Sequence, residues 1–154
     1  MPSDLGPVTA VAGGEHHTCA LTPNRTMRCW GANKDNQTQV PLDLGRVTAM
    51  AVGSSHTCAL ATARAVRFWG WNSSGQTNVP LDLGPATAIA AAWWHSCAVT
   101  AAGAVRCWGS TGAPSDLLGP VTTLAAGAYH TCAATKPGTV RCWGPDNSVG
   151  QAAA

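Results

Sequence analysis

The stretch His17-Thr18-Cys19-Ala20, followed by Arg28-Cys29-Trp30-Gly31, decides the fold because both elements return three more times. The histidine recurs at intervals of 39, 39 and 35 residues, within His56-Thr57-Cys58-Ala59, His95-Ser96-Cys97-Ala98 and His130-Thr131-Cys132-Ala133. The second element recurs as Arg67-Phe68-Trp69-Gly70, Arg106-Cys107-Trp108-Gly109 and Arg141-Cys142-Trp143-Gly144. Repetition at a period near 40 residues indicates a repeat architecture.

The segments between these elements indicate strands and turns. Their apolar runs are short, rich in Val, Thr and Ala, and bounded by Gly, Pro and Asn. No run keeps a helical period. The sequence therefore predicts an all-β protein of β-propeller blades, in one repeat domain over residues 1–154. The four repeats are expected at approximately 1–40, 41–79, 80–114 and 115–154.

Composition narrows the classes of partner. Hydrophobic residues make up 45% of the 154 residues, charged residues only 10%, and the net charge is +2. Such a chain has enough apolar residues for a folded core and is not typical of disorder. The basic stripe of a nucleic-acid binder is missing, so no nucleic-acid partner is expected. No uninterrupted apolar run reaches the roughly 18 residues of a membrane-spanning helix, so no direct membrane span is expected.

The register of the central hairpin predicts disulfide bonds. A three-residue turn closed by Thr22 and Thr26 places Cys19 opposite Cys29, at a non-hydrogen-bonded site where side chains come closest. Glycine suits the last turn position, which is left-handed, and Gly103 and Gly138 occupy it in two copies. The same count yields three predicted bridges: Cys19–Cys29, Cys97–Cys107 and Cys132–Cys142. Cys58 faces Phe68 and is left alone.

Three bridges would indicate an oxidising compartment. The expected location is therefore periplasmic, cell-surface or secreted. The alternative is a set of buried free thiols in a cytosolic protein, because cysteine also packs well inside a core. Matched pairing in three of the four copies favours the bridges.

The repeated motifs resemble those of the regulator of chromosome condensation repeat family. The resemblance rests on the recurring Gly-x-x-His-Thr-x-Ala-Leu, Val-x-x-Trp-Gly and Asn-x-x-Gly-Gln elements and covers nearly the whole chain. The short cysteine-bearing repeats look most similar to the bacterial branch, which includes a propeller-type inhibitor of β-lactamases. The resemblance implies four-stranded blades around a central axis. It does not select a function, because the family's activities are diverse.

The resemblance also implies an incomplete ring. Family propellers usually have seven blades, whereas this chain supplies about four. Half a ring would expose two apolar blade faces. The expectation is either a fragment or an association in which protein partners or further copies of the chain complete the propeller.

Residues present in every copy are expected to serve the blade. The four repeated histidines (His17, His56, His95 and His130) could form a metal site with the nearby cysteines, but equivalent residues of different blades lie too far apart to meet at one ion. A hydrogen bond to a turn within each blade is the favoured interpretation, and no metal or other cofactor is expected. The repeated Arg and Asp residues are expected to form ion pairs, and the repeated Trp residues to pack between blades.

Residues that differ between copies are the candidates for binding. The two positions before each repeated histidine vary most, and they lie between strands, at a rim. Aromatic side chains on variable loops of a rigid scaffold are typical of binding surfaces. The alternative is that the rings only fill a groove or cover a missing blade. The candidate binding residues are Glu15, His16, Ser54, Ser55, Trp71, Trp93, Trp94 and Tyr129.

No nucleophile–base arrangement or phosphate-binding glycine loop recurs in the sequence, so an enzyme is not expected. The favoured hypothesis is a non-enzymatic protein that binds other proteins through its variable rim loops. The alternative is a structural or scaffold subunit of a larger extracellular or periplasmic assembly.

Overall fold

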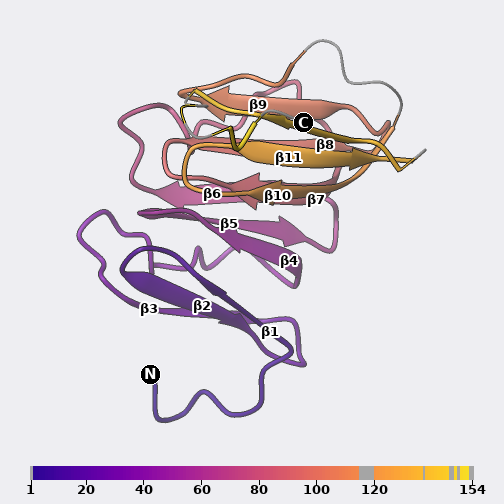
Figure 1. Cartoon of the computed structure of the whole chain (residues 1–154). Helices are drawn as coiled ribbons and strands as arrows, with labels where there is room; N and C mark the ends of the chain where they lie inside the picture. The colour runs from indigo at the N-terminus through magenta and orange to yellow at the C-terminus, as the bar shows by residue number, and fades with distance from the viewer. Residues whose placement is uncertain (1, 115–119, 137, 146–147, 149, 153–154) are drawn as a thin grey trace.

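The computed structural model describes residues 2–114, 120–136, 138–145, 148 and 150–152. All regular structure within these residues is β-strand, in four antiparallel sheets stacked in chain order (Figure 1). The strands are β1 (Ala10–Gly13), β2 (His17–Leu21), β3 (Met27–Gly31), β4 (Val47–Val52), β5 (His56–Ala61), β6 (Val66–Gly70), β7 (Ala86–Ala91), β8 (His95–Thr100), β9 (Val105–Gly109), β10 (Val121–Ala126), β11 (Thr131–Thr135) and β12 (Val140–Trp143). The predicted all-β class and the four repeats are confirmed.

Each sheet of the described residues has three strands in sequential order, whereas four strands per blade were expected. In the first two repeats, the segment after the third strand folds into turns held by its own side chains. Gln37 Oε1 accepts a hydrogen bond from the Asp35 amide at 2.9 Å, and Asn33 Oδ1 accepts one from the Thr38 amide at 3.1 Å. These side chains take the place of a neighbouring strand for the backbone amides, so the segment turns instead of pairing.

The hairpin register is the predicted one. Cys19 pairs with Cys29, Cys97 with Cys107, and Cys132 with Cys142, at Cα–Cα separations of 4.1, 4.1 and 4.0 Å. All three predicted disulfides are present. Cys58 is buried without a disulfide, and its thiol donates to the Ala51 carbonyl oxygen at 3.2 Å. Burial raises the pKa of this thiol far above its usual range.

The central hairpin turns require a left-handed residue in every repeat. Gly103 and Gly138 have φ of 84° and 90°, as expected for glycine. Arg25 and Arg64 hold the same position in the first two repeats at φ of 62° and 61°, in a region that side chains with a Cβ disfavour. The turn geometry is therefore kept across the repeats even where glycine is missing.

Three of the four repeated tryptophans pack between sheets, as predicted. Trp69 lies against the core of the first sheet around Leu21 and Met27, and Trp143 lies against Val99 of the third. Trp108 joins the core of the second sheet and meets Phe68 edge-on, with ring centroids 5.1 Å apart. Each ring thus belongs to one sheet and fills the core of the sheet before it.

Three of the four repeated histidines also act between sheets, not on turns within a blade as expected. The imidazole Nε2 of His56 lies 3.0 Å from the Ser96 hydroxyl of the next sheet, and Ser96 Oγ donates to the Gln76 carbonyl at 2.8 Å. Since the hydroxyl proton is used on Gln76, Nε2 of His56 must carry the donated proton. The Trp108 indole N–H donates to the same carbonyl at 2.9 Å.

The same polar chain links the first sheet to the second. His17 Nε2 lies 2.8 Å from Thr57 Oγ1, and both Thr57 Oγ1 and Trp69 Nε1 donate to the Gln37 carbonyl, at 2.7 and 3.1 Å. Burial lowers the pKa of His17, and it lowers those of His56 and His95 to about 4. These histidines are therefore neutral structural groups at physiological pH.

The last interface has lost part of this chain. His95 Nε2 reaches Thr131 Oγ1 at 2.7 Å, but the third repeat lacks the glutamine that supplies the shared carbonyl in the other two interfaces. Among the described residues, Trp143 Nε1 is buried with no hydrogen-bond partner. The shortened third repeat therefore costs this interface one acceptor.

The predicted Arg–Asp pairs form within repeats at the protein surface. Arg28 lies 3.0 Å from Asp4, Arg106 lies 3.1 Å from Asp82, and Arg67 pairs with Asp43. Arg28 holds the pKa of Asp4 below its usual value. Asp116, the expected partner of Arg141, lies outside the described residues. Pairs this exposed contribute little to stability.

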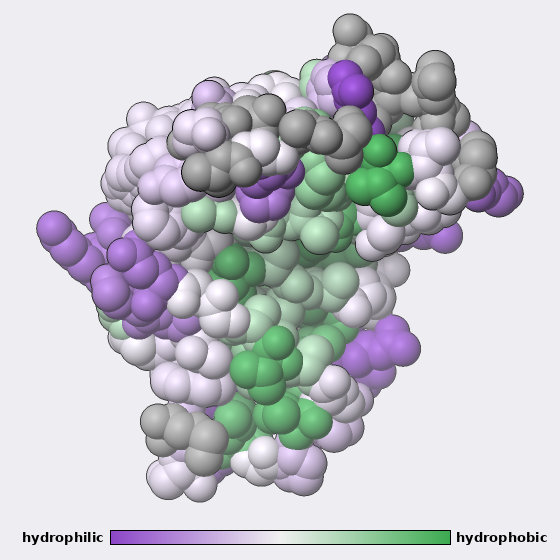
Figure 2. Space-filling view, viewed as in Figure 1, coloured by the Kyte–Doolittle hydropathy of each residue, from purple (hydrophilic) through white to green (hydrophobic). Residues whose placement is uncertain are grey.

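The two ends of the stack present faces that the inner sheets bury. Val11 of β1 holds the position that Met50 and Ile89 hold in the next two sheets, yet it is 61% exposed while they pack into interfaces. Val140 of β12 is 56% exposed. Figure 2 shows hydrophobic residues in a band across the stacked sheets.

Candidate binding site at the loop rim

The variable loops join the first and second strands of each sheet, at residues 14–16, 53–55, 92–94 and 127–130. In three of the loops the first residue is a glycine next to the repeated histidine, and the third loop has Ala92 there. A Cβ on Gly53 would overlap the imidazole of His56 and the carbonyl of Ala92. The buried histidine thus anchors one end of the loop. The next two residues are free to differ between repeats, and they are the positions that the sequence singled out.

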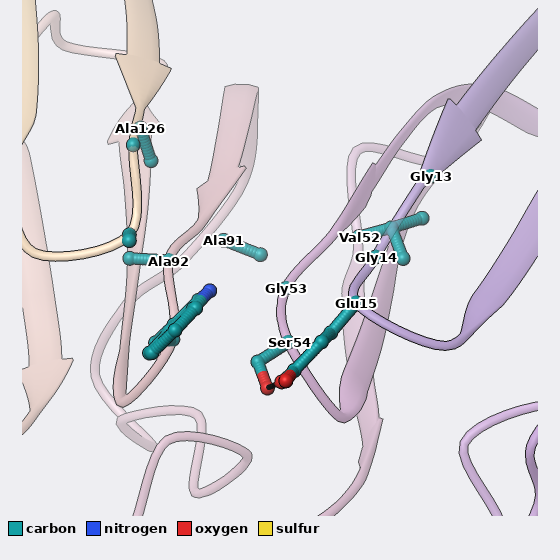
Figure 3. A pocket seen from close by; sticks show the side chains of 12 residues that line it. Gly13, Gly14, Glu15, Val52, Gly53, Ser54, Ala91, Ala92 and Ala126 are labelled. Atoms are coloured by element: carbon teal, nitrogen blue, oxygen red, sulfur yellow. Dashed lines mark hydrogen bonds between the residues drawn. The ribbon is translucent and has the colours of Figure 1, made fainter.

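These loops surround a pocket of about 310 Å³ (Figure 3). Three consecutive positions from all four sheets line it, at the end of each first strand and the start of its loop. The lining residues are Gly13, Gly14, Glu15, Val52, Gly53, Ser54, Ala91, Ala92, Trp93, Ala126, Gly127 and Ala128. Most of the pocket wall is made of small residues. The variable positions add a carboxylate, a hydroxyl and an indole ring at its edge, from Glu15, Ser54 and Trp93.

Neighbouring loops are tied together across the rim. Ser54 Oγ donates to Glu15 Oε2 at 2.8 Å, and Figure 3 shows the two side chains pointing toward each other. The Glu15 amide also donates to the Ser54 carbonyl at 3.3 Å, and the Trp93 amide donates to the Ala128 carbonyl at 3.0 Å. These bonds tie the first loop to the second and the third loop to the fourth.

Three aromatic rings form a cluster on the last two loops. The centroid of Trp93 lies 5.9 Å from that of Trp94 and 5.0 Å from that of Tyr129, and Trp94 lies 5.3 Å from Tyr129. All three side chains are only partly buried. Such rings offer large contact area with little side-chain entropy to lose on binding.

A second pocket of about 210 Å³ lies beside the first and shares Glu15, Ser54 and Trp93 with it. Ser55, Trp94, Trp71 and Asp35 complete its lining. The Trp71 amide donates to the Ser55 carbonyl at 2.9 Å, which ties the loop after β6 to the rim. The second pocket therefore combines three indole rings with two carboxylates.

The structure brings together seven of the eight predicted binding residues. Glu15, Ser54, Ser55, Trp71, Trp93 and Trp94 line the pockets, and Tyr129 packs on the two rim tryptophans. His16 lines neither pocket, although its Nε2 lies 3.5 Å from Glu15 Oε1. Their role in binding stays a prediction.

Sequence reasoning missed Asp35. This residue lies in the loop after β3, one repeat before Trp71, which occupies the corresponding loop after β6. The signal was present, because both residues are non-repeated side chains in equivalent loops. Only the stacking of the sheets shows that the two loops reach the same pocket.

A pocket of about 730 Å³ lies elsewhere, between the β2–β3 turn and the segment before β4. Its lining is mostly framework: Met27, Val40, Leu44 and Pro41 belong to positions that recur in other repeats or pack into the first core. This pocket is a groove between two blades.

Within the described residues, no three His, Cys, Asp or Glu side chains gather as metal ligands would. The same residues contain no helix long and apolar enough to cross a membrane.

Solved structures with the same fold include long propeller chains. The CRINKLY WD40 ectodomain of the Arabidopsis thaliana receptor kinase ACR4 is 25% identical with a TM-score of 0.72, over 90% of this chain and 50% of that one. Human WBSCR16 is 19% identical with a TM-score of 0.81, over 94% of this chain and 49% of that one. Prp20p from Saccharomyces cerevisiae is 19% identical with a TM-score of 0.73, over 89% of this chain and 45% of that one. This chain spans about half the length of these structures. No curated protein matches the sequence.

The sequence profile of the regulator of chromosome condensation (RCC1) repeat matches residues 8–37, 47–76 and 121–151, which is more than half of the chain. These ranges cover the three-stranded sheets β1–β3, β4–β6 and β10–β12. The third repeat lies outside them, in line with its shortened tail, but it keeps the strand register and the interface histidine of the others. The chain belongs to the RCC1 repeat family.

Proposed function

We propose that this protein is a non-enzymatic binding module that recognises another protein through its loop rim. The observation that carries the proposal is the clustering of Trp93, Trp94 and Tyr129 beside two pockets on a scaffold of cross-linked sheets. Partly exposed aromatic rings on a rigid support are the usual energetic centre of a protein interface.

The relatives support the class of function. Prp20p binds Gsp1p and histones, and the ACR4 domain is an ectodomain of a receptor kinase. Three disulfides together with an ectodomain relative favour a periplasmic, cell-surface or secreted location for this chain.

The test is quantitative capture of proteins from an extract of the native source. The baits are the unmodified chain, a Trp93→Ala/Trp94→Ala variant, and a Leu81→Ala control, whose side chain is fully exposed away from the rim pockets. The proposal expects proteins that bind the unmodified chain and the control at least tenfold more strongly than the rim variant. Equal recovery on all three baits contradicts it.

The open ends of the stack favour a second candidate, a structural subunit. Val11 and Val140 expose positions on the outer faces of the terminal sheets, and further blades from partner proteins or from other copies would cover them. Sedimentation equilibrium tests the self-association form of this candidate. A mass that is a multiple of 15.7 kDa supports it, and a stable monomer at micromolar concentration argues against it.

A further inference from the structure

We infer that the second rim pocket, formed by Trp71, Trp93, Trp94, Glu15 and Asp35 with the two serines, binds a positively charged side-chain head group, such as the ammonium group of a partner's lysine. The inference rests on the proposed function and deepens it, because it names the chemistry of the partner group. Hereafter this site is the cation pocket.

The aromatic walls suit a cation. The planes of Trp93 and Trp94 lie at 77° to each other, so the rings form two sides of a corner. Trp71 joins them from the loop after β6. The face of an indole ring carries partial negative charge and attracts ammonium and guanidinium groups, more strongly than other aromatic rings do.

The charges of the cation pocket point the same way. Glu15 and Asp35 both line it, and its lining contains no lysine or arginine. Three other aspartates, Asp4, Asp43 and Asp82, are ion-paired with arginine, whereas no Arg or Lys among the described residues forms an ion pair with Asp35. The carboxylates therefore remain available to a cation from outside.

The polar groups around the cation pocket do not cancel the negative charge of its two carboxylates. Ser54 uses its hydroxyl proton on Glu15 Oε2, so its oxygen adds acceptor capacity to the pocket. His16 lies beside Glu15, but its side chain is 72% exposed and lies outside the lining. A negatively charged ligand would meet two carboxylates here, and a neutral one would forgo the electrostatic attraction.

The size of the cation pocket fits a head group. Its volume of about 210 Å³ is below the roughly 300–1,000 Å³ of pockets that enclose whole small-molecule ligands. The adjoining pocket and the aromatic cluster supply surface for the rest of a partner protein. The pocket thus acts as a specificity element inside a larger interface.

The experiment uses three probes that differ at one nitrogen. Nα-acetyl-lysine methylamide, its Nε-trimethyl form and its neutral Nε-acetyl form are titrated into the 15N-labelled protein, and the indole N–H signals of Trp71, Trp93 and Trp94 are followed. Trp69 and Trp108, which are held in blade interfaces, serve as internal references. Both cations are expected to shift the pocket signals with dissociation constants at least fivefold lower than that of the acetylated probe. Equal binding of all three probes, or no shift with either cation, overturns the inference.

Charge removal separates this inference from the proposed function. Glu15→Gln/Asp35→Asn is expected to weaken binding of both cationic probes about tenfold, whereas Asp43→Asn, at an ion-paired carboxylate elsewhere, leaves it unchanged. The same variants then serve as baits in the capture experiment. If Trp93→Ala/Trp94→Ala loses the partner but the charge variant retains it, the cation pocket is refuted and the proposed function stands. If the charge variant binds the cationic probes less well and the rim tryptophan variant still captures every partner, the proposed function is refuted and the pocket stands.

Discussion

The imidazole Nε2 of His17 lies 2.8 Å from the hydroxyl oxygen of Thr57 in the following sheet, and Thr57 is completely buried. Thr57 also donates to the Gln37 carbonyl. One hydroxyl of the second sheet therefore contacts both a histidine and a backbone carbonyl of the first repeat. The same relationship recurs between His56, Ser96 and Gln76.

Replacing this hydroxyl by a methyl group should weaken the interface. Thr57→Val keeps the shape and the strand preference but leaves the buried His17 Nε2 proton without its acceptor, at an expected cost of about 1–3 kcal/mol in the free energy of unfolding. Urea denaturation measures it. The matched control is Thr87→Val at an exposed strand position, where the hydroxyl makes a long 3.4 Å bond to the Val99 carbonyl, with an expected change below about 0.5 kcal/mol. An equal effect of both substitutions contradicts the interface role.

Acid should destabilise the protein through its buried histidines. The pKa values of His56 and His95 are lowered by burial from 6.5 to about 4, so the folded state stays neutral where the unfolded chain binds protons. Each histidine then lowers the free energy of unfolding by up to about 1.4 kcal/mol per pH unit as the pH falls from 6.5 toward 4. Full stability is regained above pH 6.5.

Urea denaturation between pH 7.5 and 4.5 checks this slope. A His16→Gln variant, which removes an exposed histidine outside the sheet interfaces, provides the reference curve. His56→Gln removes one buried titrating ring and should reduce the slope. A free energy of unfolding that stays constant across this range is incompatible with neutral buried histidines.

The two most buried interface tryptophans should differ in their response to the same substitution. Trp108 and Trp143 are each 9% exposed, but only Trp108 has a hydrogen-bond acceptor, the Gln76 carbonyl. Trp143→Phe removes an unpaired N–H, so it should cost about 1 kcal/mol less than Trp108→Phe. Paired denaturation curves measure the difference, and an equal or larger loss for Trp143→Phe contradicts the prediction.

Thiol counting tests the cysteine arrangement. The denatured, unreduced protein should show one titratable thiol, Cys58, and the folded protein none, because the thiol is buried and its pKa is raised. Seven thiols in the denatured protein would overturn the three disulfides.

A fourth bridge can be added by the same register. Phe68 lies opposite Cys58 as Cys29 lies opposite Cys19, so Phe68→Cys should close a disulfide and leave no free thiol. The gain of about 2–3 kcal/mol expected for a short loop is partly offset by loss of the edge-on contact between Phe68 and Trp108. Mass spectrometry before and after alkylation reads the outcome, and a variant with two alkylated thiols contradicts it.

Much of the fold follows from local sequence, because it depends on spacing within one hairpin. The opposition of Cys19 and Cys29 required only the turn between Thr22 and Thr26. Contacts between repeats were harder to foresee. The partner of His17 is a hydroxyl 40 residues away, and nothing within one repeat identifies it. The prediction of a fourth strand failed in the first repeat for a related reason. The side chain of Gln37 accepts a hydrogen bond from a backbone amide that a neighbouring strand would otherwise pair.

The candidate site divides in the same way. Comparison of the copies identified Glu15 and Trp93, because these positions differ between repeats whose other positions are largely the same. The bond from Ser54 to Glu15 and the arrival of Asp35 in the same pocket depend on how the sheets stack. Those positions are set by the geometry between blades, which no single copy encodes.

The histidine-to-hydroxyl link gives the repeat two unlike edges, one offering an imidazole and a backbone carbonyl and the other offering a hydroxyl. Duplication of a 39-residue unit within the gene would therefore insert a blade whose edges match those of its new neighbours. Loss of one unit would join the remaining edges equally well. Blade number can thus drift over evolutionary time without any change to the chemistry of the junctions, and each new copy brings another rim loop that is free to diverge.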